Sequence, residues 1–142
     1  MTHCTALTDS AFTTLNISIL WYLDVTGTRV TGTFAAHVFQ KGSALKNLLA
    51  LNCVHLNADL VHVLPERHAR LSLLRLGVVN RLTESDWLQL STKFPNLHSL
   101  RICDSIAVNY AIAQSFKRNC PTLTKATLAG CNVSEDVLKL FS

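Results

Sequence analysis

Charged residues are scarce in this chain. Asp, Glu, Lys and Arg make up 15% of its 142 residues, whereas hydrophobic residues make up 49%. An ordinary globular domain carries about 25% charge, and a disordered chain carries more charge and fewer apolar residues. The composition therefore predicts a folded protein, part of whose surface is covered by another molecule. The net charge of +4 is compatible with an acidic partner.

Several other signals are missing. No apolar run approaches the ~18 residues that span a bilayer, and the N-terminus has no apolar core of signal-peptide length. The five cysteines are an odd number without a CxxC pair, which argues against a zinc site or a disulfide framework. We therefore expect no membrane insertion, no metal, and reduced cysteines in an intracellular protein, cytoplasmic or nuclear, with an organelle as the alternative.

Signals of catalysis are missing as well. The sequence shows no Ser/His/Asp order, no paired acidic residues and no glycine-rich phosphate loop. The six histidines are scattered along the chain, and we expect them to be hydrogen-bonded or solvated. We expect no catalytic residue and no cofactor, so we interpret the protein as a non-enzyme. No dense run of Lys and Arg marks a nucleic-acid-binding surface.

What the sequence does contain is an internal repeat marked by five leucines. They recur at steps of 25 or 26 residues: Leu20, Leu45, Leu71, Leu97 and Leu123. A period this regular is typical of an array of one supersecondary unit. Each of these leucines is counted below as position 1 of its unit.

Each unit opens with the pattern of a half-buried strand. Positions 1, 4 and 6 are apolar in all five units, as in Leu71, Leu74 and Leu76 of the third. Positions 4 and 6 alternate with period two, which predicts a short strand with one buried face. Stacked units would pair these strands into a parallel sheet.

A helix is expected later in each unit. Position 12 or 13 holds a small polar residue of the kind that caps a helix: Thr31, Asn57, Thr83, Asn109 and Ser134. Thr83 with Asp86 resembles a capping box. Apolar residues at helical spacing follow each of these caps. The combined pattern predicts an α/β protein with about five strand–helix units.

The repeat also predicts the domain organisation, a single domain over residues 1–142. The expected units are 1–19 (partial), 20–44, 45–70, 71–96, 97–122 and 123–142 (incomplete). Ala11, Phe12 and Leu15 would belong to the helix of the first, partial unit. Neither end shows the polar capping unit with which solenoids cover their terminal cores. Two interpretations follow: a fragment of a longer array, or a small subunit whose ends are covered by neighbours.

Position 9 carries a family resemblance. It holds small side chains: Thr28, Cys53, Val79, Ser105 and Cys131. The segment NCPTLTKATLAGCNVSEDVLKL at 119–140 resembles the cysteine-containing leucine-rich repeats of F-box proteins. The resemblance implies a right-handed β-α superhelix with strands on the concave face and helices on the convex face. It also implies substrate recognition in a ubiquitin-ligase adaptor, although no F-box precedes the repeats in this sequence.

Strand alternation places positions 3, 5 and 7 on the concave face. From these positions we predict a partner-binding surface made of Tyr22, Asp24, Leu49, Leu51, Leu73, Arg75, Arg101 and Lys125. Arg75 and Arg101 should lie side by side, with an exposed apolar patch of Tyr22, Leu49, Leu51 and Leu73 beside them. Such a surface would suit a protein segment that is apolar at one end and acidic at the other.

Two functional hypotheses follow from this pattern. The first is a non-catalytic protein–protein interaction scaffold, such as the recognition part of an adaptor. The alternative is a structural subunit packed permanently in a large multi-protein or ribonucleoprotein assembly, in which nucleic acid would be a partner only through that assembly.

Overall fold

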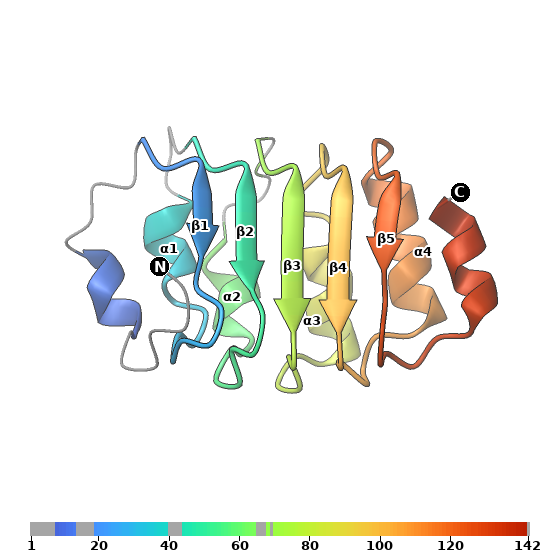
Figure 1. The fold of residues 1–142 in the computed structure, drawn as a ribbon, viewed down its shortest axis with the longest axis horizontal. Coiled ribbons are helices and arrows are strands. Elements are labelled where there is room, and N and C mark those ends of the chain that lie inside the picture. The colour runs from blue at the N-terminus through green and yellow to red at the C-terminus, as the bar shows by residue number, and fades with distance from the viewer. Residues whose placement is uncertain (1–7, 14–18, 40–43, 65–67, 69, 142) are drawn as a thin grey trace.

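The computed structural model describes residues 8–13, 19–39, 44–64, 68 and 70–141. Its centre is a sheet of five strands: β1 (Tyr22–Asp24), β2 (Asn47–Ala50), β3 (Leu73–Gly77), β4 (Ser99–Cys103) and β5 (Lys125–Thr127). The strands lie in chain order and every neighbouring pair is parallel (Figure 1). The prediction of an α/β protein with a parallel sheet is therefore confirmed.

The register of the sheet joins equivalent positions of the sequence repeat. Position 4 forms one continuous row across the five strands: Leu23, Leu48, Leu74, Leu100 and Ala126. The four leucines of this row are at most 4% exposed. Because side chains alternate along a strand, positions 3 and 5 then point away from this buried row.

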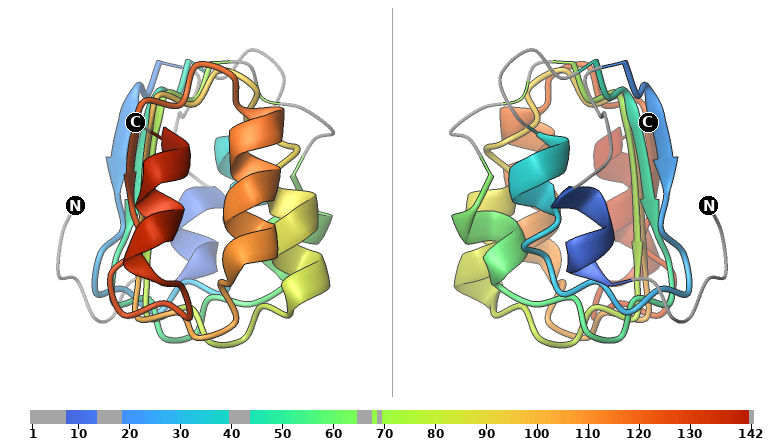
Figure 2. Two further views of the ribbon diagram at one scale, coloured as in Figure 1. Left: turned by 90° about the vertical axis from the view of Figure 1, so that its right-hand side faces the viewer. Right: turned by 90° about the vertical axis from the view of Figure 1, so that its left-hand side faces the viewer.

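Helices cover one face of the sheet. They are η1 (Asp9–Thr13), α1 (Ala35–Val38), α2 (Asp59–His62), α3 (Glu84–Leu90), α4 (Tyr110–Asn119) and η2 (Glu135–Phe141), of which η1 and η2 are 3-10 helices. Both side views show all six on the same side of the strands (Figure 2). The core lies between the two layers, and Trp87 and Phe116 fill it from α3 and α4. The opposite face of the sheet is called the open face below.

The helix caps divide into two groups. Thr83 caps α3 in a complete capping box with Asp86, and the Asn109 side chain caps α4 by accepting from the Ile112 amide at 3.1 Å; both predictions are confirmed. The prediction for Thr31 is wrong, since α1 is only four residues long and begins after Phe34 without a side-chain cap. Asn57 stands one residue before the assigned N-cap Ala58 of α2, and its Oδ1 accepts a hydrogen bond from the Asp59 amide at 3.0 Å, so this side chain does serve the start of the helix. After Ser134 the chain forms a 3-10 helix instead of the expected α-helix.

Asp9 takes over the role of the missing cap at α1. Its carboxylate accepts hydrogen bonds from the amides of Thr31 and Phe34, at 3.1 and 3.0 Å, and from the Thr31 hydroxyl at 2.8 Å. Partial burial alone would raise the pKa of Asp9, but these hydrogen bonds outweigh it and hold the pKa below the ordinary 3.8. The ionised Asp9 carboxylate therefore stabilises the folded protein at neutral pH, and this stabilisation is lost in acid as the pH falls through the lowered pKa of Asp9.

A feature that the sequence pattern did not predict lies at position 8. In every unit this residue has a positive φ: Gly27 (73°), Asn52 (55°), Val78 (57°), Asp104 (52°) and Gly130 (68°). Each of these residues follows its strand at the turn towards the helical side. Gly, Asn and Asp tolerate this left-handed conformation, whereas a β-branched residue is strained in it. Val78 is therefore the strained member of the row.

Replacing Val78 should stabilise the protein. Val78 is only partly buried, so Val78→Asn loses little apolar burial while it removes left-handed strain of about 1–2 kcal/mol. We expect the free energy of unfolding in urea to rise by about 1 kcal/mol. Val54→Asn is the matched control, because Val54 is 53% exposed and does not have a positive φ. If Val78→Asn were less stable than wild type, the claim that Val78 is strained would be wrong.

Candidate functional site

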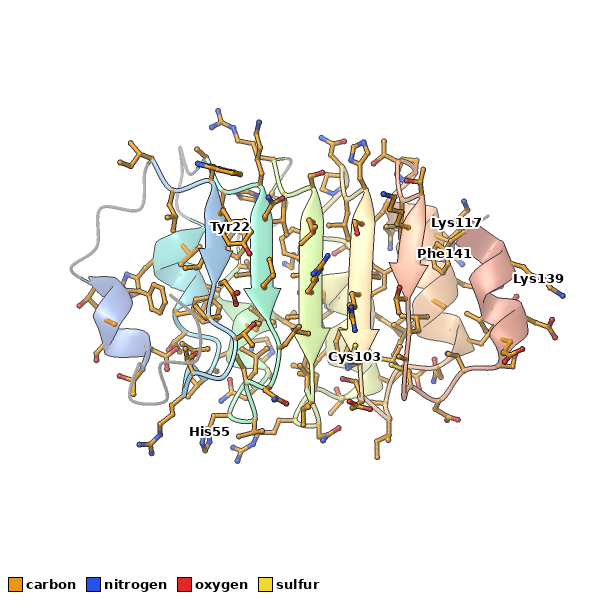
Figure 3. The ribbon with its side chains drawn as sticks, viewed as in Figure 1. Tyr22, His55, Cys103, Lys117, Lys139 and Phe141 are labelled. Carbon is orange, nitrogen blue, oxygen red and sulfur yellow. The ribbon has the colours of Figure 1, made fainter. Side chains whose placement is uncertain are left out.

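Three rows of side chains make up the open face. Position 3 contributes Tyr22, Asn47, Leu73, Ser99 and Lys125; position 5 contributes Asp24, Leu49, Arg75, Arg101 and Thr127. Position 7 includes Gly77 and Cys103, which are also registered neighbours. Figure 3 looks onto this face, with Tyr22 on β1 and Cys103 on β4 labelled. All eight residues predicted for partner binding lie in these rows or, like Leu51, directly after a strand.

Their exposure differs most from the prediction at Leu49. Tyr22 is 44% exposed, Arg101 and Lys125 are also exposed, and Leu51 and Leu73 are partly buried. Leu49, however, is only 9% exposed, which corrects its predicted place in an exposed apolar patch. It stands inside the sheet between its registered neighbours Asp24 and Arg75. The exposed apolar part of the face is therefore smaller than expected.

Leu51 closes the space that Gly77 leaves open. A Cβ atom on Gly77 would stand 2.9 Å from the Cδ2 atom of Leu51, so the leucine side chain leans over this part of β3. The absence of a side chain at Gly77 thus brings apolar surface close to Arg75, two residues earlier on the same strand.

Arg75 and Arg101 are direct neighbours in the register of β3 and β4. Adjacent strands lie ~4.8 Å apart, and like charges at this spacing repel. Among the described residues the one salt bridge found joins Lys139 to Asp136, far from this pair. Within its row the pair is flanked by Leu49 and Thr127, neither of which carries charge. The repulsion is thus not balanced by any carboxylate that the structure describes.

The two nearest carboxylates serve local roles. Asp24 Oδ1 accepts a hydrogen bond from the backbone amide of Thr26 at 2.9 Å, which stabilises the turn after β1. The Asp104 side chain lies against Gly130, in the space that a Cβ atom would need. In the part of the chain that the structure describes, Asp104 forms no ion pair with either arginine.

The Arg101 side chain is anchored along its own strand. Its Nε donates to the Cys103 thiol sulfur at 3.3 Å. This contact uses the inner nitrogen of the guanidinium and leaves its two terminal nitrogens, with four N–H donors, pointing away from the anchor. A side chain held in this way loses less conformational freedom when it binds an anion.

The other residues considered for chemistry have structural roles. Cys53 and Cys120 are buried, and burial raises the pKa of Cys120 to about 11, which keeps this thiol protonated. No group of His, Cys, Asp and Glu suited to a metal ion occurs among the described residues. Trp87 is fully buried, and Trp21 is 61% exposed.

His68 differs from the expectation for histidines. It is 8% exposed, its ring packs against Phe39 at 4.8 Å, and its Nδ1 has no hydrogen-bond partner among the described residues. Burial lowers the pKa of His68, with the positive charge of Arg70 adding to the effect. The imidazole is therefore neutral at pH 7. No sequence signal distinguishes this histidine from the exposed ones, since its partners come from other units.

Exposed apolar side chains gather at the β1 edge of the sheet. Ile19 is 77% exposed and Trp21 is 61% exposed, and the Trp21 ring meets the Tyr22 ring edge-on at 6.0 Å between centroids. At the other edge, β5 carries exposed Lys125 and Thr127. Charged residues such as lysine protect a sheet edge from association, whereas exposed apolar residues do not. The two edges therefore differ in their tendency to associate.

Comparison with known proteins leaves the function to be argued from the structure. The sequence matches no family model, and no curated protein matches it at a significant level. Within the described residues, every helix is too short or too polar to cross a bilayer.

Proposed function

We propose that the chain is a leucine-rich-repeat solenoid of about five units that acts as a non-catalytic protein-interaction scaffold. The register supports the repeat, because it pairs position 4 with position 4 across the whole sheet. The common left-handed residue at position 8 supports it independently. In such a solenoid the open face would be the concave, ligand-binding surface.

The observation that carries the binding function is the unbalanced Arg75–Arg101 pair on the open face. Lys125 lies one strand further on, and Tyr22, Leu51 and Leu73 lie towards β1. A partner segment with apolar residues over β1–β3 and acidic residues over β3–β5 would satisfy both parts. From β1 to β4 the sheet spans three strand spacings, or ~14 Å, which an extended segment covers in about four residues.

We therefore expect a partner motif in which an apolar residue precedes or follows an acidic one at a separation of about four residues. The recognition repeats of ubiquitin-ligase adaptors, which the sequence resembles, would use such a motif to select their substrates. The organisation of the face does not itself require that role, and any acidic protein segment of this pattern would fit.

A peptide selection tests the proposal. We expect selection of a random peptide library against the immobilised wild-type protein to enrich this motif. Arg75→Glu combined with Arg101→Glu should weaken binding of the selected peptides at least about tenfold, because a hydrogen bond to a charged group contributes about 1.5–3 kcal/mol. The control is Lys117→Glu with Arg118→Glu, two exposed residues of α4 in the helical layer (Figure 3). Urea unfolding checks that both double variants are folded. Binding that survives the Arg75 and Arg101 substitutions would refute the proposal.

The exposed β1 edge favours a second candidate function, a permanent subunit of a larger assembly. Ile19 and Trp21 expose apolar surface at an edge that a neighbouring chain could cover. The purified protein would then self-associate, and Trp21→Lys, by adding charge to the edge, would restore a monomer in analytical ultracentrifugation. A wild-type protein that stays monomeric at high concentration favours the scaffold.

A further inference from the structure

The spacing of Arg75 and Arg101 restricts the kind of acidic group that fits them. In an extended peptide, side chains on the same face are two residues or ~6.8 Å apart, whereas the two arginines stand on strands ~4.8 Å apart. Two neighbouring carboxylates of a partner therefore do not match the pair one to one. A single group placed between the arginines does match it.

The charge of the pair restricts the group further. One carboxylate carries one negative charge and would leave the second guanidinium unbalanced, with Leu49 and Thr127 as the uncharged flanks in the row. A phosphoryl group carries about −1.5 to −2 at pH 7 and three acceptor oxygens. It can therefore neutralise both guanidinium groups and accept hydrogen bonds from each.

The anchor of Arg101 suits this task. Because Nε already donates to Cys103 at 3.3 Å, the guanidinium presents its terminal N–H groups as a fork, which is the arrangement that recognises phosphate oxygens. Lys125 stands on the next strand, opposite Ser99 and two residues from the level of Arg101. Its long side chain can bring a third positive charge to a phosphoryl group held between Arg75 and Arg101.

We propose that Arg75 and Arg101 together bind one phosphorylated side chain of the partner protein, with Cys103 as the positioning residue of Arg101. The inference rests on the proposed protein-binding function and adds that the partner is recognised in its phosphorylated form. Binding would then be regulated by a kinase and a phosphatase that act on the partner.

The test uses the arginine side chains as reporters and needs no identified partner. The Nε–Hε signals of the folded protein are followed by NMR while N-acetyl-phosphoserine or N-acetyl-glutamate is added. We expect saturable shifts at Arg75 and Arg101 with phosphoserine, at a Kd at least tenfold below that for glutamate. Arg29 and Arg81 are the internal controls, being exposed arginines of the loops that follow β1 and β3.

Four outcomes would overturn the inference. Equal affinity for the two amino acids would mean that the pair accepts any acidic group, and equal shifts at Arg29 and Arg81 would mean general charge attraction. Stronger perturbation by phosphatidylcholine vesicles containing phosphatidic acid would assign the pair to a membrane surface. Acidic peptides that bind through Arg75 and Arg101 without a gain from phosphorylation would remove this inference and leave the scaffold function intact.

Substituting lysine for both arginines separates fork geometry from charge. Arg75→Lys with Arg101→Lys keeps two positive charges but removes the planar donors. We expect the preference for phosphoserine over glutamate to fall to near unity in this variant. A preference that is retained would show that charge alone selects the ligand, and would contradict the assigned role of the fork.

Discussion

Gly32→Ala is expected to destabilise the protein by about 3 kcal/mol or more, the largest effect of a single methyl group in the chain. Gly32 has φ +125°, which an L-residue rarely adopts, and an added Cβ would stand 2.5 Å from the backbone nitrogen of Leu60 and 3.0 Å from its Cα. These atoms belong to α2, so the helix itself would have to move. Equilibrium unfolding in urea measures the loss.

Gly130→Ala is the control for this effect. Gly130 also has a positive φ, of 68°, but its added Cβ would mainly meet the exposed side chain of Asp104, and its backbone contact, with the Asp104 Cα at 3.2 Å, is looser than the 2.5 Å contact at Gly32. We expect Gly130→Ala to cost only the left-handed strain, about 1–2 kcal/mol. Equal losses at the two glycines would show that contact with the α2 backbone does not matter.

Leu74→Ala should cost about 2–5 kcal/mol. Leu74 is 1% exposed in the central strand β3, with Leu48 and Leu100 as its registered neighbours in the buried row. Both neighbours are held by their own strands, so the cavity that the substitution leaves cannot collapse fully. The midpoint of urea or thermal unfolding measures the effect.

Leu73→Ala provides the matched comparison, because it removes the same atoms from the adjacent residue. Leu73 is only partly buried and lies on the open face. We expect a loss below about 1 kcal/mol, in proportion to the smaller apolar area that it removes from water. If Leu73→Ala and Leu74→Ala cost the same, the assignment of the two faces of β3 would be wrong.

Core variants and arginine variants together separate effects on stability from effects on binding. Gly32 and Leu74 lie in the core, whereas Arg75 and Arg101 lie on the open face. The double glutamate variant replaces one pair of like charges on neighbouring strands with another, and it removes no buried leucine from the core. It should therefore lose binding without a comparable loss of stability.

The sequence by itself determined the five strands, their parallel order and the face on which each residue lies. The physical reason is that the apolar residues at positions 4 and 6 must be buried together, and a period of two places both of them on one face of the strand. The same rule placed Arg75 beside Arg101. It also located the caps of α3 and α4, where Thr83 and Asn109 have their partners three residues away.

The features that depend on contacts between distant parts of the chain could not be read from the sequence pattern. Asp9, 22 residues before Thr31, replaces the expected cap of α1, and Leu49 is only 9% exposed where it stands between its registered neighbours Asp24 and Arg75. Val78 adopts the left-handed conformation although nothing in its side chain favours it, and its amide donates to the Cys103 carbonyl at 2.9 Å, a bond to the neighbouring strand. Local propensity is a fraction of a kcal/mol per residue, and packing overrides it.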